Sequence, residues 1–147
     1  MFSVDQNPFK GATVAVLGDF MLDEFVFGAV ERISPEAPVP VVTVKDRQQT
    51  LGGAGNVVFN LKSLGVNSLP VGILGMDSAA ETVKTMCAQH GISLDSMLYT
   101  NRPTTFKMRV VAEGQHVVRV DDEVKEGLSP QERTALKEKL AEIRPQA

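Results

Sequence analysis

The sequence is poor in residues that mark several classes of protein. Its 147 residues include one cysteine, one tyrosine and no tryptophan. Because Cys87 has no partner, no disulfide can form within the chain, and a reducing compartment is the simplest inference. The first residues contain no apolar signal core, and no apolar run approaches the roughly 20 residues of a membrane span. We therefore expect a cytoplasmic protein with no membrane partner.

An excess of positive charge is missing as well. The chain carries 15 Lys and Arg against 18 Asp and Glu, a net charge of -3. This balance argues against nucleic acid or anionic membrane as the main partner, and we expect no metal site. Hydrophobic residues make up 43% of the chain and charged residues 22%, as in ordinary globular proteins. The length suits one core, which is one domain or one lobe of a larger domain.

The most informative stretch is residues 51–56. Gly52, Gly53 and Gly55 have no side chains there, so a ligand could approach the backbone closely. Apolar residues at helical spacing follow it, and Gly65 fits a left-handed helix end. A glycine turn that opens a helix presents backbone N–H groups at the positive end of the helix dipole, which suits a ligand. A plain strand-to-helix turn is the alternative. The dinucleotide and P-loop patterns are excluded, because the third glycine of the first and the Lys-Ser/Thr pair of the second are absent.

Short apolar runs predict strands on both sides of this turn. Residues 13–17 and 69–74 are typical of strands buried on both faces. Ser78 and Glu81 fit a capping box for a second helix, and Ser129 begins a third. The alternation of strand and helix predicts an α/β fold with a parallel sheet and right-handed crossovers.

Other segments do not fit the parallel sheet. Residues 33–40 contain three prolines, which place the strand of residues 39–44 at an edge or outside the main sheet. Residues 46–50 are expected to be a polar link. Asp19 and Asp23 follow the first strand. Ligands of open α/β sheets bind beyond the carboxyl ends of the strands, so both acids are site candidates. The alternative is that they cap a turn.

Residues 106–120 alternate with a period of two and predict a hairpin. A three-residue loop keeps one face apolar, and it sets Arg109 opposite Arg119 with Lys107 beside Asp121. Like charges directly opposite each other are destabilising unless an anion lies between them. The pattern therefore favours a phosphate or carboxylate ligand. A solvated face with two neighbouring aspartates as counter-charges is the alternative.

With these residues placed, the chain resembles the ribokinase-like (PfkB-type) carbohydrate kinases. That family's first signature is matched in spacing by Gly52-Gly53-Ala54, Asn56, Gly65 and Gly75, although Val58 stands where a smaller residue is usual. Within the family, residues 18–23, 32–40 and 105–109 are similar to those of the D-glycero-β-D-manno-heptose 7-phosphate kinases. Those enzymes are often fused to an adenylyltransferase that makes ADP-heptose for lipopolysaccharide.

The resemblance implies a fold and a site. The fold would be a parallel αβα sandwich with a small β lid, of which residues 1–147 form the N-terminal part and residues 25–46 and 104–121 form the lid. In relatives, an Asp after the first strand and the glycine pair hold the sugar hydroxyls, and cations on the lid would suit a phosphate that the sugar already carries. The substrate-binding residues predicted in this way are Asp19, Asp23, Gly52, Gly53, Asn56, Lys107, Arg109 and Arg119.

The resemblance also implies what the chain lacks. The family's catalytic Gly-Ala-Gly-Asp segment and its nucleotide site belong to a later part of the domain, so we expect no catalytic residue here and no activity of this chain alone. ATP and Mg²⁺ are implied for the full-length enzyme, which would phosphorylate the anomeric position of the heptose phosphate, and neither is expected to bind this chain tightly. Relatives suggest a homodimer formed through the lid. Two alternatives stay open: a stand-alone sugar-binding or assembly module, and a kinase for ribose, fructose or a nucleoside.

Overall fold

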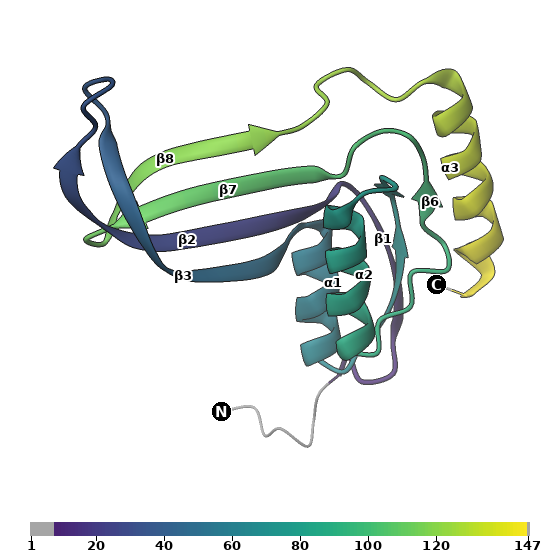
Figure 1. Cartoon of the computed structure of the whole chain (residues 1–147). Coiled ribbons are helices and arrows are strands. Elements are labelled where there is room, and N and C mark those ends of the chain that lie inside the picture. The colour runs from purple at the N-terminus through teal and green to yellow at the C-terminus, as the bar shows by residue number, and fades with distance from the viewer. Residues whose placement is uncertain (1–7, 147) are drawn as a thin grey trace.

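The computed structural model describes residues 8–146. In chain order the elements are β1 (Thr13–Leu17), β2 (Phe20–Ile33), β3 (Pro40–Gly53), α1 (Ala54–Ser63), β4 (Asn67–Val71), β5 (Ile73–Leu74), α2 (Ser78–Gln89), β6 (Leu98–Tyr99), β7 (Thr105–Ala112), β8 (Gln115–Asp122), α3 (Pro130–Ile143) and the 3₁₀ turn η2 (Arg144–Gln146). They form a layered body from which one long sheet projects (Figure 1).

The body has three layers. Its strands pair in parallel, β1 with β4 and β5 with β6. Helices α1 and α2 pack on one side around Val58 and Val83, which are fully buried. Helix α3 packs on the other side, where Leu136 and Ile143 contact Val71. This arrangement confirms the predicted αβα sandwich with parallel strands.

The projecting sheet consists of four strands in the order β3-β2-β7-β8. Strand β2 lies in its centre, antiparallel to β3 and parallel to β7. Phe20 and Leu22 at the start of β2 are buried in the core of the body, which anchors the sheet there. From that root the strands extend away from the helices (Figure 1). The prediction that the proline-rich segment leads into an edge strand outside the parallel sheet is confirmed by β3.

Two predictions about the body strands need correction. β1 is not buried on both faces, because Val14 is 39% and Leu17 55% exposed; among the described residues its only strand neighbour is β4. The run 69–74 is two strands rather than one, since Gly72 separates β4 from β5. A Cβ at Gly72 would collide with the carbonyl oxygen of Gly18, so the chain bends where only glycine fits.

Two further corrections concern polar residues. Residues 46–50 are not a link but part of β3, because their backbone pairs with β2 while their side chains stay exposed. The N-cap of α2 is Asp77, not Ser78: its Oδ1 accepts from the Ala80 N–H at 2.8 Å. The third helix begins as predicted, with a complete capping box between Ser129 and Glu132.

The hairpin β7–β8 has the predicted register but not the predicted loop. Arg109 lies opposite Arg119 and Lys107 opposite Asp121, as expected. The turn, however, has two residues, Glu113 (φ 51°) and Gly114 (φ 75°), both left-handed as hairpins of this length prefer. An irregularity after Val110 absorbs the remaining residue of β8. A shorter turn and a β-bulge together give the register that a three-residue loop would give.

Candidate functional site

An open hollow of about 550 Å³, which we call the main hollow, lies where the projecting sheet meets the start of α1. It is lined by Asp23, Phe25, Thr50, Leu51, Gly52, Gly53, Asn56, Arg109 and His116. These residues come from β2, β3, α1, β7 and β8, so the hollow depends on both the body and the sheet. Five of the eight residues predicted from the sequence line it.

The glycine pair makes room for the polar groups of this hollow. Gly52 is paired with Met21 across the β2–β3 ladder, and a Cβ at Gly52 would collide with the carboxylate of Asp23. Gly53 has a φ of 54°, and a Cβ there would collide with the carbonyl oxygen of Asp19. The same carbonyl accepts the N–H of Ala54 at 2.9 Å. Glycine is therefore required at both positions by the chain itself, whether or not a ligand is bound.

Helix α1 begins directly at the hollow. Its N-cap is Gly53, and no side chain caps its first turn. The first N–H groups of a helix have no partners within the helix and carry its positive dipole end, so this turn can receive polar oxygens. Asn56 is exposed, and its side-chain oxygen accepts a long hydrogen bond of 3.4 Å from Asn60. Such an amide remains available to hydroxyl groups in the hollow.

Asp23 and Arg109 form an ion pair across β2 and β7. Arg109 Nη1 lies 2.5 Å from Asp23 Oδ1, with side chains only 23% and 16% exposed. The guanidinium also lies over the ring of Phe25, 5.2 Å from its centroid. Both neighbours hold Arg109 in one orientation, with several guanidinium N–H groups beyond the one that binds Asp23. The carboxylate and the guanidinium thus act as one unit in the wall of the hollow.

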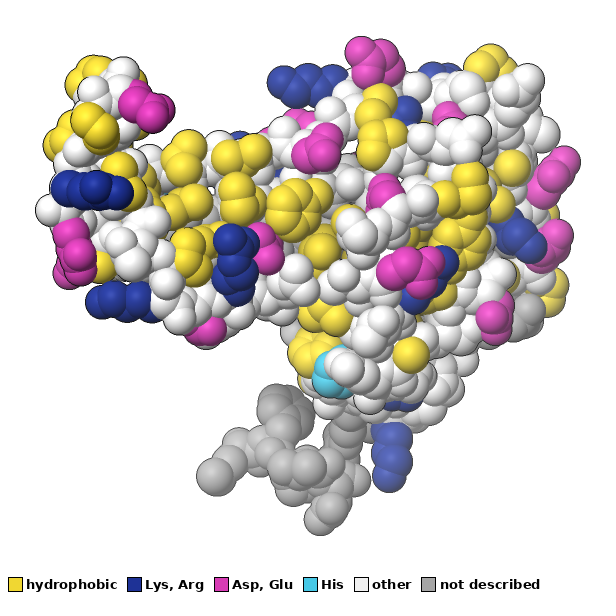
Figure 2. All heavy atoms as spheres, in the orientation of Figure 1, with side chains coloured by type: hydrophobic (Ala, Val, Ile, Leu, Met, Phe, Trp, Pro, Cys, Tyr) yellow, Lys and Arg dark blue, Asp and Glu magenta, His cyan; other side chains and the backbone are white. Residues whose placement is uncertain are grey.

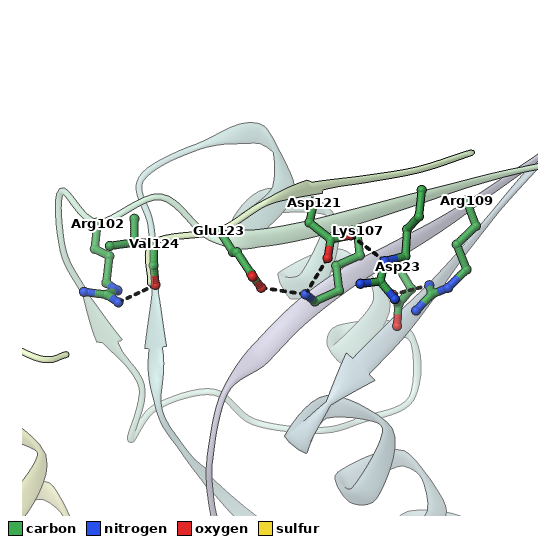
Figure 3. A network of polar contacts seen from close by, with 8 residues as sticks. Asp23, Arg102, Lys107, Arg109, Asp121, Glu123 and Val124 are labelled. Atoms are coloured by element: carbon green, nitrogen blue, oxygen red, sulfur yellow. Dashed lines mark hydrogen bonds and ion pairs between the residues drawn. The ribbon is translucent and has the colours of Figure 1, made fainter. Parts of the chain in front are cut away.

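Lys107 belongs to a second cluster on the same face of the sheet (Figure 3). Its Nζ lies 2.6 Å from Glu123 Oε2 and 3.2 Å from Asp121 Oδ2. The contact with Glu123, followed by that with Asp121, raises the pKa of the Lys107 ammonium group. Burial alone would raise the pKa of Asp121, but Lys107 and Arg119 outweigh it and hold that pKa below its usual value. Lys107 therefore remains charged and well neutralised.

The remaining predicted residues lie outside the main hollow. Asp19 and Lys107 line an adjacent hollow of about 390 Å³ that reaches Arg102 and α3. Arg119 is exposed, with its Nε 3.0 Å from Asp121 Oδ1; the two attract as charges, but they are not aligned for a hydrogen bond, since Oδ1 has no hydrogen-bond partner. The counter-charges of the two opposed arginines are thus Asp23 and Asp121.

Arg102 and His116 line these hollows but were not predicted from the sequence as site residues. Arg102 donates from Nη2 to the carbonyls of Val124 and Glu126, at 2.9 and 2.6 Å, and so ties the segment after β8 to the body. His116 lines the main hollow although it lies near the far end of the hairpin. Its position depends on the bulge in β8, which leaves no trace in a simple alternation of residue types. Arg102 precedes a proline in a loop, where its side chain could not be placed from periodicity.

Residues 8–146 contain no group of three or more His, Cys, Asp or Glu side chains placed to share a metal ion. Within that range, no helix has both the length and the apolar character needed to cross a bilayer.

The family of the chain follows from comparisons with known proteins. The model of the pfkB family carbohydrate kinases matches residues 12–145. The chain is 47% identical over 112 residues to the D-beta-D-heptose 7-phosphate kinase of Bordetella bronchiseptica, covering 76% of this chain and 36% of that protein. It is 43% identical over 129 residues to the bifunctional protein HldE of Gluconacetobacter diazotrophicus, covering 87% of this chain and 27% of that protein. The chain thus spans about a third of such relatives or less.

Solved structures show the same fold at much lower identity. The ribokinase of Arabidopsis thaliana, complexed with ribose and ATP, superposes with a TM-score of 0.59 at 19% identity, over 77% of this chain and 36% of that one. A carbohydrate kinase from Agrobacterium tumefaciens superposes with a TM-score of 0.62 at 23% identity, over 76% of this chain and 35% of that one. By its sequence match and its fold, the chain belongs to the pfkB family of carbohydrate kinases.

Proposed function

We propose that this chain is the sugar-binding part of a kinase that transfers a phosphoryl group from ATP to a heptose 7-phosphate. The observation that carries the proposal is the grouping of Asp23, Gly52, Asn56 and Arg109 around one hollow. It is supported by 47% identity to a D-beta-D-heptose 7-phosphate kinase. We place the reaction at the anomeric hydroxyl, in the cytoplasmic supply of ADP-heptose for lipopolysaccharide.

In this proposal each wall of the hollow has a task. The Asp23 carboxylate accepts hydrogen bonds from sugar hydroxyls, and the bare backbone at Gly52 and Gly53 lets the sugar approach closely. Asn56 offers an amide to a further hydroxyl. Arg109 turns its remaining N–H groups to the phosphate that the substrate already carries, because guanidinium groups bind phosphate oxygens in pairs.

The chemistry of transfer needs groups beyond this hollow. Phosphoryl transfer depends on positioning the nucleotide and stabilising charge on the moving group. Asp23 is already engaged by Arg109, which does not suit it to take a proton from the attacking hydroxyl. We therefore expect the 147-residue chain to bind the sugar phosphate without transferring a phosphoryl group. ATP as the donor is inferred from relatives such as the Arabidopsis ribokinase, whose structure contains ATP.

A calorimetric titration of the chain with heptose 7-phosphate, heptose and ribose tests this proposal. We expect heptose 7-phosphate to bind most tightly, and Asp23→Asn to weaken both heptoses about tenfold, since a hydrogen bond to a charged group contributes about 1.5–3 kcal/mol. Asp122→Asn is the matched control, because Asp122 neighbours Asp121 on β8 but faces away from the hollow. No binding of heptose 7-phosphate, or turnover of ATP above that of a mock preparation, would contradict the proposal. Equal affinity for ribose would favour a kinase of another sugar.

We also propose that two copies of the chain associate through the projecting sheet. The face of this sheet that lies away from the hollow is apolar, and hydrophobic side chains gather there over β2, β7 and β8 (Figure 2). Val118 and Val120 on this face are 48% and 45% exposed. A contiguous exposed apolar surface of this kind is typical of an interface.

A further inference from the structure

The β-bulge in β8 changes which face of the sheet its residues occupy. Val110 pairs with Val118, but the next residue, Val111, pairs with His116, so Val117 is the extra residue. In a regular strand, residues three apart point to opposite faces. His116 and Arg119 are three residues apart, but the extra residue between them restores the alternation. His116 therefore lies on the same face as Arg109 and Arg119. Bulges commonly serve to redirect a side chain in this way.

His116 is a residue of the hollow whose ring is free to bind a ligand. It lines the hollow together with Asp23 and Arg109. It is exposed, and among residues 8–146 no hydrogen bond or ion pair engages its ring. Its charged neighbours on this face are already matched, since Arg109 pairs with Asp23, and Lys107 and Arg119 pair with Asp121. An imidazole always carries at least one N–H donor, whichever protonation state it adopts.

The groups of the hollow are ordered along the strands. The bare glycines and Asn56 lie at the body end, followed by Asp23. Arg109 pairs with Phe25, two residues farther out along β2, and Val111, the partner of His116, pairs with Phe27, two residues farther again. Two residues of a strand span about 7 Å. Hydroxyl-binding groups therefore lie near the body, and cationic or N–H donor groups lie farther out.

We propose that His116 is a ligand for the terminal phosphate of the substrate, and that the bulge at Val117 exists to aim it there. The inference rests on the proposed function and sharpens it: the substrate is a sugar long enough to keep its hydroxyls at Asp23 while a phosphate monoester at its other end reaches Arg109 and His116. The imidazole N–H donates to a phosphate oxygen on the side that Arg109 does not cover. A sugar without the phosphate leaves His116 unused.

Calorimetry of the chain with heptose 7-phosphate and with heptose tests this role. His116→Ala is expected to weaken heptose 7-phosphate roughly tenfold, the effect of one hydrogen bond to a charged group, and to leave heptose unchanged. His116→Gln keeps an N–H donor and should retain most of the affinity. His90→Ala is the matched control, because His90 is the other histidine of the chain and packs against Phe59 at the end of α2.

NMR of the imidazole rings gives an independent measurement. With two histidines in the chain, the His90→Ala variant assigns both sets of ring signals. The His116 signals should shift on addition of heptose 7-phosphate but not of heptose. If the wild type binds heptose 7-phosphate while His116→Ala binds it equally well, this inference is overturned and the proposed function stands. If the wild type does not bind heptose 7-phosphate at all, both fail together.

Discussion

At the scale of single residues, the ion pair between Asp23 and Arg109 joins two roles that the sequence treats separately. Residue types alone suggest a carboxylate for hydroxyls and a cation for phosphate. In the structure the two groups are bonded to each other and are mostly shielded from water. Removing either one leaves the other partly buried without its partner, which costs free energy beyond the lost ligand contact. In the proposed function, the hydroxyl side and the phosphate side of the substrate would therefore be sensed through one coupled pair.

A double-mutant cycle measures this coupling. Asp23→Asn and Arg109→Met should each weaken heptose 7-phosphate, and the double variant should lose less than the sum of the two. We expect a coupling energy of about 0.5–3 kcal/mol, as for residues in direct contact. Calorimetric titration of the four proteins gives the value. Losses that add to within about 0.5 kcal/mol would mean that the pair does not persist when the ligand is bound.

At the scale of elements, periodic patterns in the sequence predicted strands and their register, but they did not predict turns, bulges or other local irregularities. Alternation in residues 106–120 correctly placed Arg109 opposite Arg119, because a slip of one residue would turn the apolar face to the wrong side. The same alternation could not show that a two-residue turn and a β-bulge together produce this register. For that reason His116 was not predicted as a residue of the hollow. Residues 46–50 look like a link because they are polar, yet pairing with β2 overrides their weak strand propensity. The glycine pattern, in contrast, predicted the family correctly, since its steric demands are met in the backbone itself.

The junction between α2 and β7 depends on Asp77. Its Oδ1 caps α2, and its Oδ2 accepts the N–H of Thr104 at 2.7 Å. Thr104 is buried, and its hydroxyl accepts the N–H of Gly75 at 2.8 Å. A side chain at Gly75 would collide with both Asp77 and Thr104. One carboxylate thus fixes the point at which the chain leaves the body to enter the projecting sheet.

Replacing Asp77 by Ala should lower the free energy of unfolding by about 1.5–3 kcal/mol at pH 7, through the lost cap and the lost bond to Thr104. Burial alone would raise the pKa of Asp77, but the N–H groups of Thr104 and Ala80 outweigh it and lower that pKa. The stabilisation is therefore complete above the usual pKa of 3.8 and is lost as the pH falls through the lower folded value. Urea unfolding of both proteins at pH 7 and pH 2.5 should show a smaller difference at the lower pH. Ser78→Ala, at the position that the sequence favoured as the cap, is the control and should cost less than about 0.5 kcal/mol.

At the scale of the whole molecule, the two faces of the projecting sheet have opposite characters. One face carries the charged residues of the two hollows. The other face is mostly apolar, and the part of it beyond the helices is open (Figure 2). Within the apolar face, Glu24 is only 8% exposed and accepts from Arg47 at 3.0 Å and from Gln49 at 3.2 Å. A sheet that binds ligand on one face and a second copy on the other would hold the hollow rigid through the interface. Association should then depend on the apolar face alone.

Sedimentation equilibrium from 1 to 100 µM tests that dependence. The wild-type chain should approach twice the 15.9 kDa mass of one chain. Val120→Glu should weaken association by about two orders of magnitude or more, because an uncompensated charge in an apolar interface costs about 3–5 kcal/mol. Val57→Glu is the control: Val57 is 48% exposed, close to the 45% of Val120, but lies on α1. A wild-type monomer throughout the range, or equal disruption by Val57→Glu, would show that the sheet face is not the interface. If Val120→Glu also leaves the affinity for heptose 7-phosphate intact, the two faces act independently, and the rigidity of the hollow comes from its anchor in the body.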